Sequence, residues 1–361
     1  MRDEMTNVAE HSNGESAGTA VPLVSLVVPV WNGERYLRES LDSILGQTYP
    51  ELEVIAVDDA STDSTPEILA SYGDRIRVVR QPETRGIYGN ANDGIALARG
   101  DFVGVFHADD VYLPEMVERE VGWLLEHPGS GAVFTSAVFV DRDGREFGRK
   151  DLPGDVRGNK ELDYTTVLNT LLARKNAFLG CPTALVRADV YRELGGYRDA
   201  EFKNTSDLEM WLRIARSRSI GVIEDCLIRY RKGHGSSSDR YHRLRTDPER
   251  FFTIMDIELD AEGGREVAKP EALTAYEAHR TVDTTMRSVN HYIRGERDEA
   301  RAVLAGVRLR TLASSPRVQR SRMVALALAM RVLVRLPRIS SVARLLERRW
   351  DGTPAVLSRR A

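Results

Sequence analysis

Two pairs of adjacent aspartates are the residues of this chain that are best placed for chemistry. Asp58-Asp59 and Asp109-Asp110 each come after an apolar run that is typical of a buried strand. Carboxylate oxygens are the ligands that hard divalent cations prefer. The alternative interpretation is that these residues only form turns or cap the next element. This alternative explains a single pair well. It explains two pairs less well, because both are expected at the same edge of one sheet, where ligands bind.

The elements that position these aspartates alternate between strand and helix along the first half of the chain. Apolar runs predict strands at residues 24–30, 53–57, 75–79 and 101–106. Helical spacing and helix start signals predict helices at about 37–45, from 65 onward and at about 88–98. This order predicts an α/β fold with a mainly parallel sheet and helices on both faces. Ligands bind such sheets outside the carboxyl ends of the strands.

The second half has a less regular pattern. It predicts a helix at about 113–126, a strand at 132–140, a further strand ending near 187, a helix at 207–216 and helical structure from about 248 onward. The polar, glycine-bearing segment 149–163 is expected to form a long loop that can lie over a site.

The charge of the chain is divided between two parts. The total of 361 residues has a formal net charge of −3, but residues 310–361 contain twelve arginines against Glu347 and Asp351. This tail therefore carries +10 and the other 309 residues carry −13. An acidic body argues against a nucleic-acid-binding face. The length predicts about two domains, or one large α/β domain with an appendage.

Cysteine content and hydropathy exclude several classes of protein. Cys181 and Cys226 are too few for a disulfide scaffold, and the absence of a CxxC motif argues against structural zinc, so a reducing compartment is expected. Residues 1–20 are polar and are expected to be disordered rather than to act as a secretory signal. The longest candidate membrane segment, 323–330, has only eight residues before Arg331, whereas a spanning helix needs about 20.

Four stretches of the sequence carry a family resemblance: VSLVVPVWNGERYLRESLDSILGQTYPELEVIAVDDASTDST, RGIYGNANDGIALARGDFVGVFHADDVYLP, CPTALVRADVYRELGGYRD and TSDLEMWLRIA. In this order and at these spacings they resemble family-2 glycosyltransferases, which are inverting enzymes of the GT-A (Rossmann-like) fold that use nucleotide-sugar donors. The resemblance covers about residues 23–235. It implies a disordered extension at 1–21, a GT-A catalytic domain at 22–245 and a helical, basic region at 246–361.

The resemblance implies a divalent cation, Mn²⁺ or Mg²⁺, held after the fourth strand. Asp109 matches the metal-binding aspartate of the family's DxD element, and Ala108 lies at the middle position of that element. The first position, normally an acid, is His107, which is suited to hydrogen-bond a ribose hydroxyl or to act as a neutral metal ligand. Asp110 is expected to support the site as a hydrogen-bond acceptor.

The resemblance also implies a set of donor-binding residues. Asp59 matches the aspartate that reads the base, and a carboxylate that accepts the N3–H of uracil favours a UDP-sugar. Further donor contacts are expected in the first loop and beyond, at Pro29, Trp31, Asn32, Glu34, Arg85, Asn92 and Arg231. His234 is expected to close over the diphosphate beside Arg231 and to be an additional metal ligand.

The catalytic base that the resemblance implies is Asp207. Inversion requires one in-line displacement at the anomeric carbon, with a base that takes the proton of the attacking acceptor hydroxyl. The family places this base at the start of a helix, where TSDLEMWLR lies here. Glu209 is the rival, but it lies two residues farther along the helix and is expected to point elsewhere.

The basic tail contains an apolar pattern with helical spacing. Val324, Leu328, Val332 and Leu336 recur in this way beside Arg331 and Arg335. A basic amphipathic helix fits an anionic membrane surface, and each Lys or Arg near that surface contributes about 1 kcal/mol. The alternative is a helical hairpin that packs on the catalytic domain or on a second subunit, which makes a homo-oligomer a candidate assembly.

Together these observations predict a metal-assisted inverting glycosyltransferase. The expected acceptor is a glycan or a lipid-linked saccharide in the synthesis of cell-surface polysaccharides or glycoconjugates, and the expected location is the cytoplasm or the inner face of the cell membrane. A catalytically impaired sugar-nucleotide-binding or scaffold protein is one alternative. A sugar nucleotidylyltransferase fits less well, because PVWNGERY is not the glycine-rich, cation-bearing loop that would grip a triphosphate.

Overall fold

The computed structural model describes residues 21–158, 160–233, 244–312, 317–337 and 339–351. Its strands are β1 (Val24–Val30), β2 (Leu52–Asp58), β3 (Arg77–Arg80), β4 (Phe102–Val105), β5 (Val111–Tyr112), β6 (Ser130–Val140), β7 (Glu146–Arg149), β8 (Glu161–Leu162), β9 (Ala184–Arg187) and β10 (Ser219–Arg231). The predicted extension at 1–20 and the candidate ligand His234 lie outside the described residues.

A single mixed sheet organises the first two thirds of the chain, with the strand order β3-β2-β1-β4-β9-β6-β10-β5. The pairs β1–β2, β1–β4 and β2–β3 are parallel, as the β-α-β pattern of the first half predicts. The short strand β9 then pairs antiparallel with both β4 and β6. The sheet therefore combines a parallel half with a mixed half, in which β6–β10 is parallel and β10–β5 is again antiparallel.

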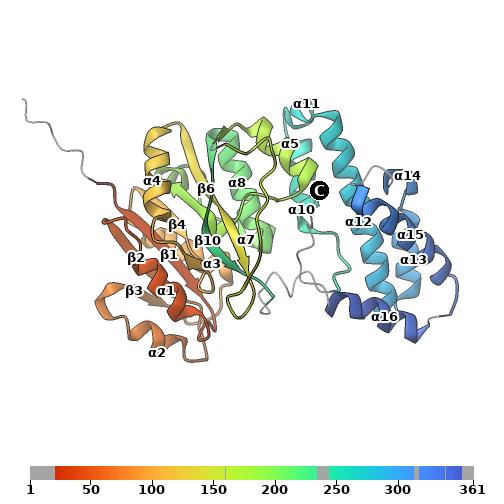
Figure 1. Ribbon diagram of the computed structural model, residues 1–361, viewed down its shortest axis with the longest axis horizontal. Helices are drawn as coiled ribbons and strands as arrows, with labels where there is room; N and C mark the ends of the chain where they lie inside the picture. The colour runs from red at the N-terminus through yellow and green to blue at the C-terminus, as the bar shows by residue number, and fades with distance from the viewer. Residues whose placement is uncertain (1–20, 159, 234–243, 313–316, 338, 352–361) are drawn as a thin grey trace, which may run out of the picture.

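Helices cover both faces of this sheet (Figure 1). Those of the sheet-bearing part are α1 (Leu37–Leu45), α2 (Thr65–Ala70), α3 (Ile87–Leu97), α4 (Met116–Glu126), α5 (Tyr164–Arg174), α6 (Ala188–Leu194), α7 (Asp199–Phe202) and α8 (Ser206–Ser217). Buried side chains of α1, α2 and α4 pack on one face, and those of α3, α5, α6 and α8 pack on the other. The two cysteines, Cys181 and Cys226, are free thiols.

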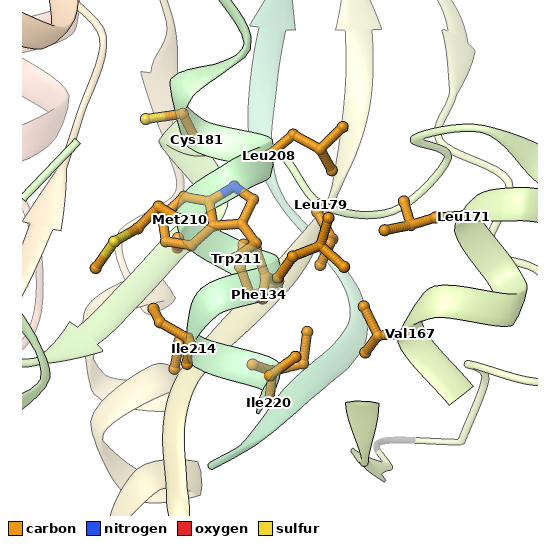
Figure 2. Packing of buried hydrophobic residues seen from close by; sticks show 14 of the residues in the cluster. Phe134, Val167, Leu171, Leu179, Cys181, Leu208, Met210, Trp211, Ile214 and Ile220 are labelled. Atoms are coloured by element: carbon orange, nitrogen blue, oxygen red, sulfur yellow. The ribbon is translucent and has the colours of Figure 1, made fainter. Parts of the chain in front are cut away.

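Apolar packing fixes the position of α8, the helix that carries Asp207 in its first turn. Trp211 on α8 is fully buried, and its ring meets the edge of the Phe134 ring from β6 at a centroid distance of 5.0 Å. Leu208 and Met210 of the same helix belong to this cluster, to which α5 contributes Val167 and Leu171 (Figure 2). Burial of several large apolar side chains holds the helix rigidly against the sheet.

The C-terminal part consists of helices in the described residues. They are α10 (Arg250–Asp260), α11 (Gly264–Val267), α12 (Pro270–Arg294), α13 (Arg297–Ala305), α14 (Leu309–Leu312), α15 (Arg317–Leu333) and α16 (Ser340–Asp351). Side chains of α10 and of the first half of α12 join the large core on the sheet. The rest of α12 forms a separate apolar cluster with α13–α16, on the side away from the sheet (Figure 1).

The predicted tail stripe lies on the outer surface of this helical cluster. Ala327, Met330 and Val334 are buried against the neighbouring helices. Leu328 and Val332 are 47% and 56% exposed. The tail thus packs on its own helical region through one face and leaves the other apolar face exposed. Among the described residues, the helices are all too short or too polar to cross a membrane.

Candidate active site

A large cleft opens where the carboxyl ends of β1, β2 and β4 meet, as expected for this class of sheet. Its volume is about 1480 Å³, which exceeds the range of about 300–1,000 Å³ common for single-ligand pockets. The sequence-predicted residues that line it are Pro29, Trp31, Asn32, Asp59, His107, Ala108, Asp109, Asp207 and Arg231. The cleft therefore has room for two substrates and brings most of the predicted residues together.

An acidic cluster forms one end of the cleft. His107, Asp109 and Asp110 place one candidate ligand atom each within 4.8 Å of one another. The His107 Nδ1 atom lies 3.6 Å from Oδ2 of Asp110. Both this Oδ2 atom and Nε2 of His107 are buried without a hydrogen-bond partner in the described part of the chain. Since unpaired buried polar atoms are costly, these two atoms fit a site completed by a cation.

The protonation states of this cluster suit a ligand role for the histidine. Burial lowers the pKa of His107, although the charge of Asp109 opposes this. The imidazole is therefore neutral at pH 7 and keeps a nitrogen lone pair for a metal or a hydroxyl group. Burial and the charge of Asp109 raise the pKa of Asp110 well above its usual range.

Arg231 holds the loop that carries these acids. Its backbone N–H donates to Oδ1 of Asp110 at 2.7 Å, and its Nε donates to the carbonyl of Asp109 at 2.9 Å. The guanidinium also pairs with Glu39 at 2.8 Å and lies 4.3 Å from the centre of the Tyr36 ring. In this structure Arg231 orients the acidic loop, and the proposed contact of its side chain with a diphosphate stays a prediction.

Asp59 lies buried at the end of β2, beside the loop that precedes α3. Its two carboxylate oxygens accept hydrogen bonds from the backbone N–H groups of Arg85, at 2.6 Å, and Gly86, at 3.0 Å. Gly86 has a φ of +77°, which a residue with a side chain rarely adopts, and this conformation allows both N–H groups to converge. Asp58 instead accepts from Ser61 N–H at 3.0 Å, so it supports its own turn.

The first loop is tied to the second by two of the predicted residues. Asn32 Oδ1 accepts from Thr62 N–H at 2.8 Å, and Glu34 Oε2 accepts from Ser64 N–H at 3.1 Å. Asn32 lines the cleft and Glu34 does not. Trp31 follows β1 in this loop, has 49% of its surface exposed and lines the cleft.

Arg85 and Asn92 have structural partners outside the cleft. The Arg85 guanidinium pairs with Asp93 at 2.8 Å. The Asn92 amide exchanges two hydrogen bonds with the backbone of Tyr197, each 2.8 Å long, and so pins the turn before α7. Neither residue is among those that line the cleft, and their roles in donor binding stay predictions.

Asp207 stands in the first turn of α8 and faces the same cleft as the acidic cluster. Burial raises the pKa of its carboxyl group and outweighs the opposing hydrogen bonds from Leu208 and Tyr88 and the charge of Lys150. A raised pKa is what a carboxylate needs to accept a proton at neutral pH. Glu209 points away: it binds Arg213 at 3.0 Å and does not line the cleft.

Several residues of the cleft carry no recognisable motif. Tyr88 hydrogen-bonds to Asp207, and burial raises its pKa well above the usual value, so its hydroxyl stays protonated. Lys150 and Lys232 line the opposite wall together with Tyr230. The predicted long loop at 149–163 was the only sequence signal near Lys150, since its surroundings come from distant parts of the chain.

The family model for glycosyl transferase family 2 matches residues 25–195. The putative glycosyltransferase EpsE of Bacillus subtilis (strain 168) is 31% identical over 228 residues, which are 62% of this chain and 76% of EpsE. The chain belongs to glycosyl transferase family 2. This family match includes Asp59, His107 and Asp109 but ends before Asp207 and Arg231.

Other family-2 relatives give the extent of the likeness. The putative teichuronic acid biosynthesis glycosyltransferase TuaG of the same Bacillus strain is 27% identical over 66% of this chain and 89% of TuaG. By contrast, the matched segments cover only 31–65% of the length of four uncharacterized glycosyltransferases from Rickettsia species.

Solved structures confirm the GT-A type of fold. S. aureus TarS 1-349 in complex with UDP-GlcNAc superposes with a TM-score of 0.58 at 20% identity, covering 91% of each chain. The Pyrobaculum calidifontis mannosyltransferase PcManGT, in complex with GDP-Man and Mn²⁺, gives a TM-score of 0.51 at 20% identity and covers 93% of this chain and 89% of that one. The predicted α/β architecture with a helical C-terminal region is therefore correct.

Proposed function

We propose that this chain is an inverting glycosyltransferase that moves a sugar from a nucleotide-diphosphate donor to an acceptor hydroxyl. The observation that carries this proposal is the shared cleft, in which Asp207 and the His107–Asp109 cluster face one space large enough for both substrates. A base and a charge-binding site on either side of a reacting carbon are what an in-line displacement requires. Family membership supports the same reaction class.

The metal we propose is Mn²⁺ or Mg²⁺, with Asp109 and His107 as its protein ligands and Asp110 in support. The unpaired Nε2 of His107 and Oδ2 of Asp110 favour a cation here. When bound, such an ion neutralises the charge that develops on the departing diphosphate. Arg231 keeps the loop in place through Asp109 and Asp110, so the chain itself sets the ligand positions.

The proton of the acceptor hydroxyl passes to Asp207 in this proposal. The buried core around Trp211 fixes α8, and the Tyr88 hydroxyl, which stays protonated, holds the carboxylate by a hydrogen bond. Burial raises the pKa of Asp207, which makes it a stronger base than an exposed aspartate. Positioned proton transfer of this kind typically contributes about 10²–10⁴-fold to the rate.

We propose a UDP-sugar as the favoured donor. Asp59 lies at the end of the cleft beside Trp31, where a carboxylate and an aromatic ring suit a nucleobase. The titles of two relatives name different donors, UDP-GlcNAc for TarS and GDP-Man for PcManGT, and they support a nucleotide sugar more strongly than a particular base.

The acceptor we propose is a glycan or a lipid-linked saccharide of a cell-surface polysaccharide. The name of TuaG, which refers to teichuronic acid biosynthesis, supports a polysaccharide as the product. We also propose that the C-terminal helices contact an anionic membrane. Leu328, Val332 and Leu336 are exposed, and so are the arginines Arg322, Arg335 and Arg344 of the same C-terminal helices and their connection. A second copy fits this surface less well, because two cationic faces would meet.

The test is donor turnover by the full chain. With Mn²⁺ and a panel of UDP-, GDP- and dTDP-sugars, hydrolysis or transfer with one sugar class is the expected result, with inversion at the anomeric carbon seen by NMR. A catalytically impaired binding protein would instead show thermal stabilisation by a nucleotide sugar without turnover. Release of pyrophosphate from a sugar phosphate and a nucleoside triphosphate would identify a nucleotidylyltransferase.

A further inference from the structure

Two lysines line the wall of the cleft that the second half of the chain supplies. Lys150 follows β7, and Lys232 follows β10. Both line the same cleft as His107, Asp109 and Asp207. Neither was expected from the sequence to act in the site.

The ammonium group of Lys150 has no hydrogen bond or ion pair to any other residue in the described ranges. Its main-chain N–H donates to Ala137 at 2.8 Å, which fixes the backbone but leaves the side chain unpaired. Nζ lies close to Gly180, where an added Cβ atom would be 3.3 Å from it. The neighbouring acid, Asp151, pairs with Arg157.

Two carboxylates interact with this pair of lysines. Lys232 lowers the pKa of Asp110 through its charge, so it lies on the side of the acidic cluster. Lys150 interacts electrostatically with both Lys232 and Asp207. Lys232 Nζ also sits 4.6 Å from the centre of the Phe139 ring. Because the two ammonium groups carry like charges, an anion bound near both would reduce their mutual repulsion.

We propose that Lys150 and Lys232 form an anion subsite that binds a phosphate-class group of a substrate between the acidic cluster and Asp207. This inference rests on the proposed function. Two sources can supply such a group: the diphosphate of the donor, or an acidic substituent of the acceptor. The position between the proposed metal ligands and the proposed base favours the diphosphate, since the transferred carbon must lie between leaving group and base.

The electrostatics of Lys150 give the subsite a pH signature. Burial and the charge of Lys232 lower the pKa of Lys150 to about 7, against the opposing charge of Asp207. Other charged groups on this wall are Arg149 and Asp151 on its own segment and Arg174 and Lys175 at the end of α5. A bound anion raises the pKa of Lys150, so its contribution to binding is complete below about pH 7 and falls as the pH rises further.

Calorimetric titration of the full chain with UDP, UMP and inorganic phosphate tests the subsite without relying on turnover. Lys150→Met is expected to weaken UDP binding by about ten- to hundredfold at about pH 6.5, which corresponds to one charged hydrogen bond. Lys150→Arg is expected to retain affinity at about pH 8.5, where the wild type loses it, because arginine remains charged. Arg192→Met is the matched control, because it removes an exposed positive charge from α6.

The results separate the two sources and the two proposals. If Lys150→Met loses more affinity for UDP than for UMP, each compared with wild type, the bound anion is the donor diphosphate. Unchanged UDP binding with weaker binding of inorganic phosphate assigns it to the acceptor. Equal affinities and equal pH dependence of Lys150→Met and wild type, in a variant with an unchanged melting temperature, overturn the subsite. Normal anion binding in a chain without transferase activity would contradict the proposed function alone.

Discussion

The sheet-bearing part and the C-terminal helices use charge in opposite ways. In the cleft, the carboxylates of Asp109 and Asp207 are half-buried, and burial raises the pKa of Asp207. On α15 and α16, arginines such as Arg335 and Arg344 are exposed beside apolar side chains that are also exposed. Buried charges must be compensated individually, whereas exposed charges act together as a field.

This contrast suggests that the cleft carries out catalysis and that the C-terminal helices attach the protein to a surface. A change of one atom in the cleft alters a defined proton or ion site, so large effects on catalysis are expected there. A change on the tail removes a fraction of a summed attraction, so smaller effects are expected, and they should affect binding to a surface. Variants that violate this division would show that the two regions are coupled.

The largest effect is expected for Asp207→Asn. Loss of the proposed base should lower kcat for transfer by about 10²–10⁴-fold while UDP binding stays within a few-fold of wild type. Steady-state kinetics with the sugar nucleotide that the donor panel selects measures this. Glu209→Gln is the control, because that side chain pairs with Arg213 and should affect stability more than kcat. Equal losses of kcat in both variants would show that α8, and not one carboxylate, is the sensitive element.

The second effect concerns the cation. In the presence of UDP, Asp109→Asn should lower the apparent affinity for Mn²⁺ by about a hundredfold. Residues that only orient metal ligands already contribute about 10–100-fold to metal affinity, so loss of a ligand should cost at least as much. Thermal shift against Mn²⁺ concentration measures it. Asp74→Asn removes an equal charge from an exposed helix and should leave the curve unchanged. If Asp109→Asn binds Mn²⁺ normally, the metal ligands lie elsewhere.

The third effect tests the tail. Each apolar side chain withdrawn from water contributes about 1.5–3 kcal/mol when fully buried, so Val332→Ser with Leu336→Ser should weaken binding to anionic vesicles by about tenfold or more. Co-sedimentation at low and high salt measures it, with wild-type binding also reduced by salt. Leu125→Ser, on α4 and equally exposed, is the control. A wild-type chain that stays in the supernatant at low salt contradicts membrane contact, and sedimentation as a dimer would favour self-association.

The first half of the fold could be predicted from the sequence because its signals are local. Buried β-branched runs such as 24–30 and start signals such as Thr65-Pro66 mark elements without reference to the rest of the chain. The insertion of β9 between β4 and β6 could not be predicted in this way. β9 has four residues, and its antiparallel pairing depends on contacts between segments far apart in sequence.

The same distinction applies to the site. The acidic cluster follows a strand directly, and the resemblance placed it before the structure did. Asn92 and Arg231 form hydrogen bonds with residues more than a hundred positions away in the sequence. No local sequence pattern could have predicted these contacts. Lys150 could not be predicted for a related reason, because its lowered pKa arises from burial and from the charge of Lys232, which only the fold brings near.

The smallest expected effect is that of pH on activity and on vesicle binding. It distinguishes the cleft from the tail most directly. Transfer should require Asp207 to be deprotonated, so kcat falls by up to tenfold per unit as the pH drops below the raised pKa of that group. On the alkaline side donor affinity should fall above about pH 7 as Lys150 loses its proton. The tail binds through arginines, which stay charged throughout this range, so vesicle binding should be flat where activity is bell-shaped. Parallel measurement of kcat/KM and vesicle binding between about pH 5 and pH 9 checks this, and a common pH profile for both would mean that the cleft and the tail respond to the same group.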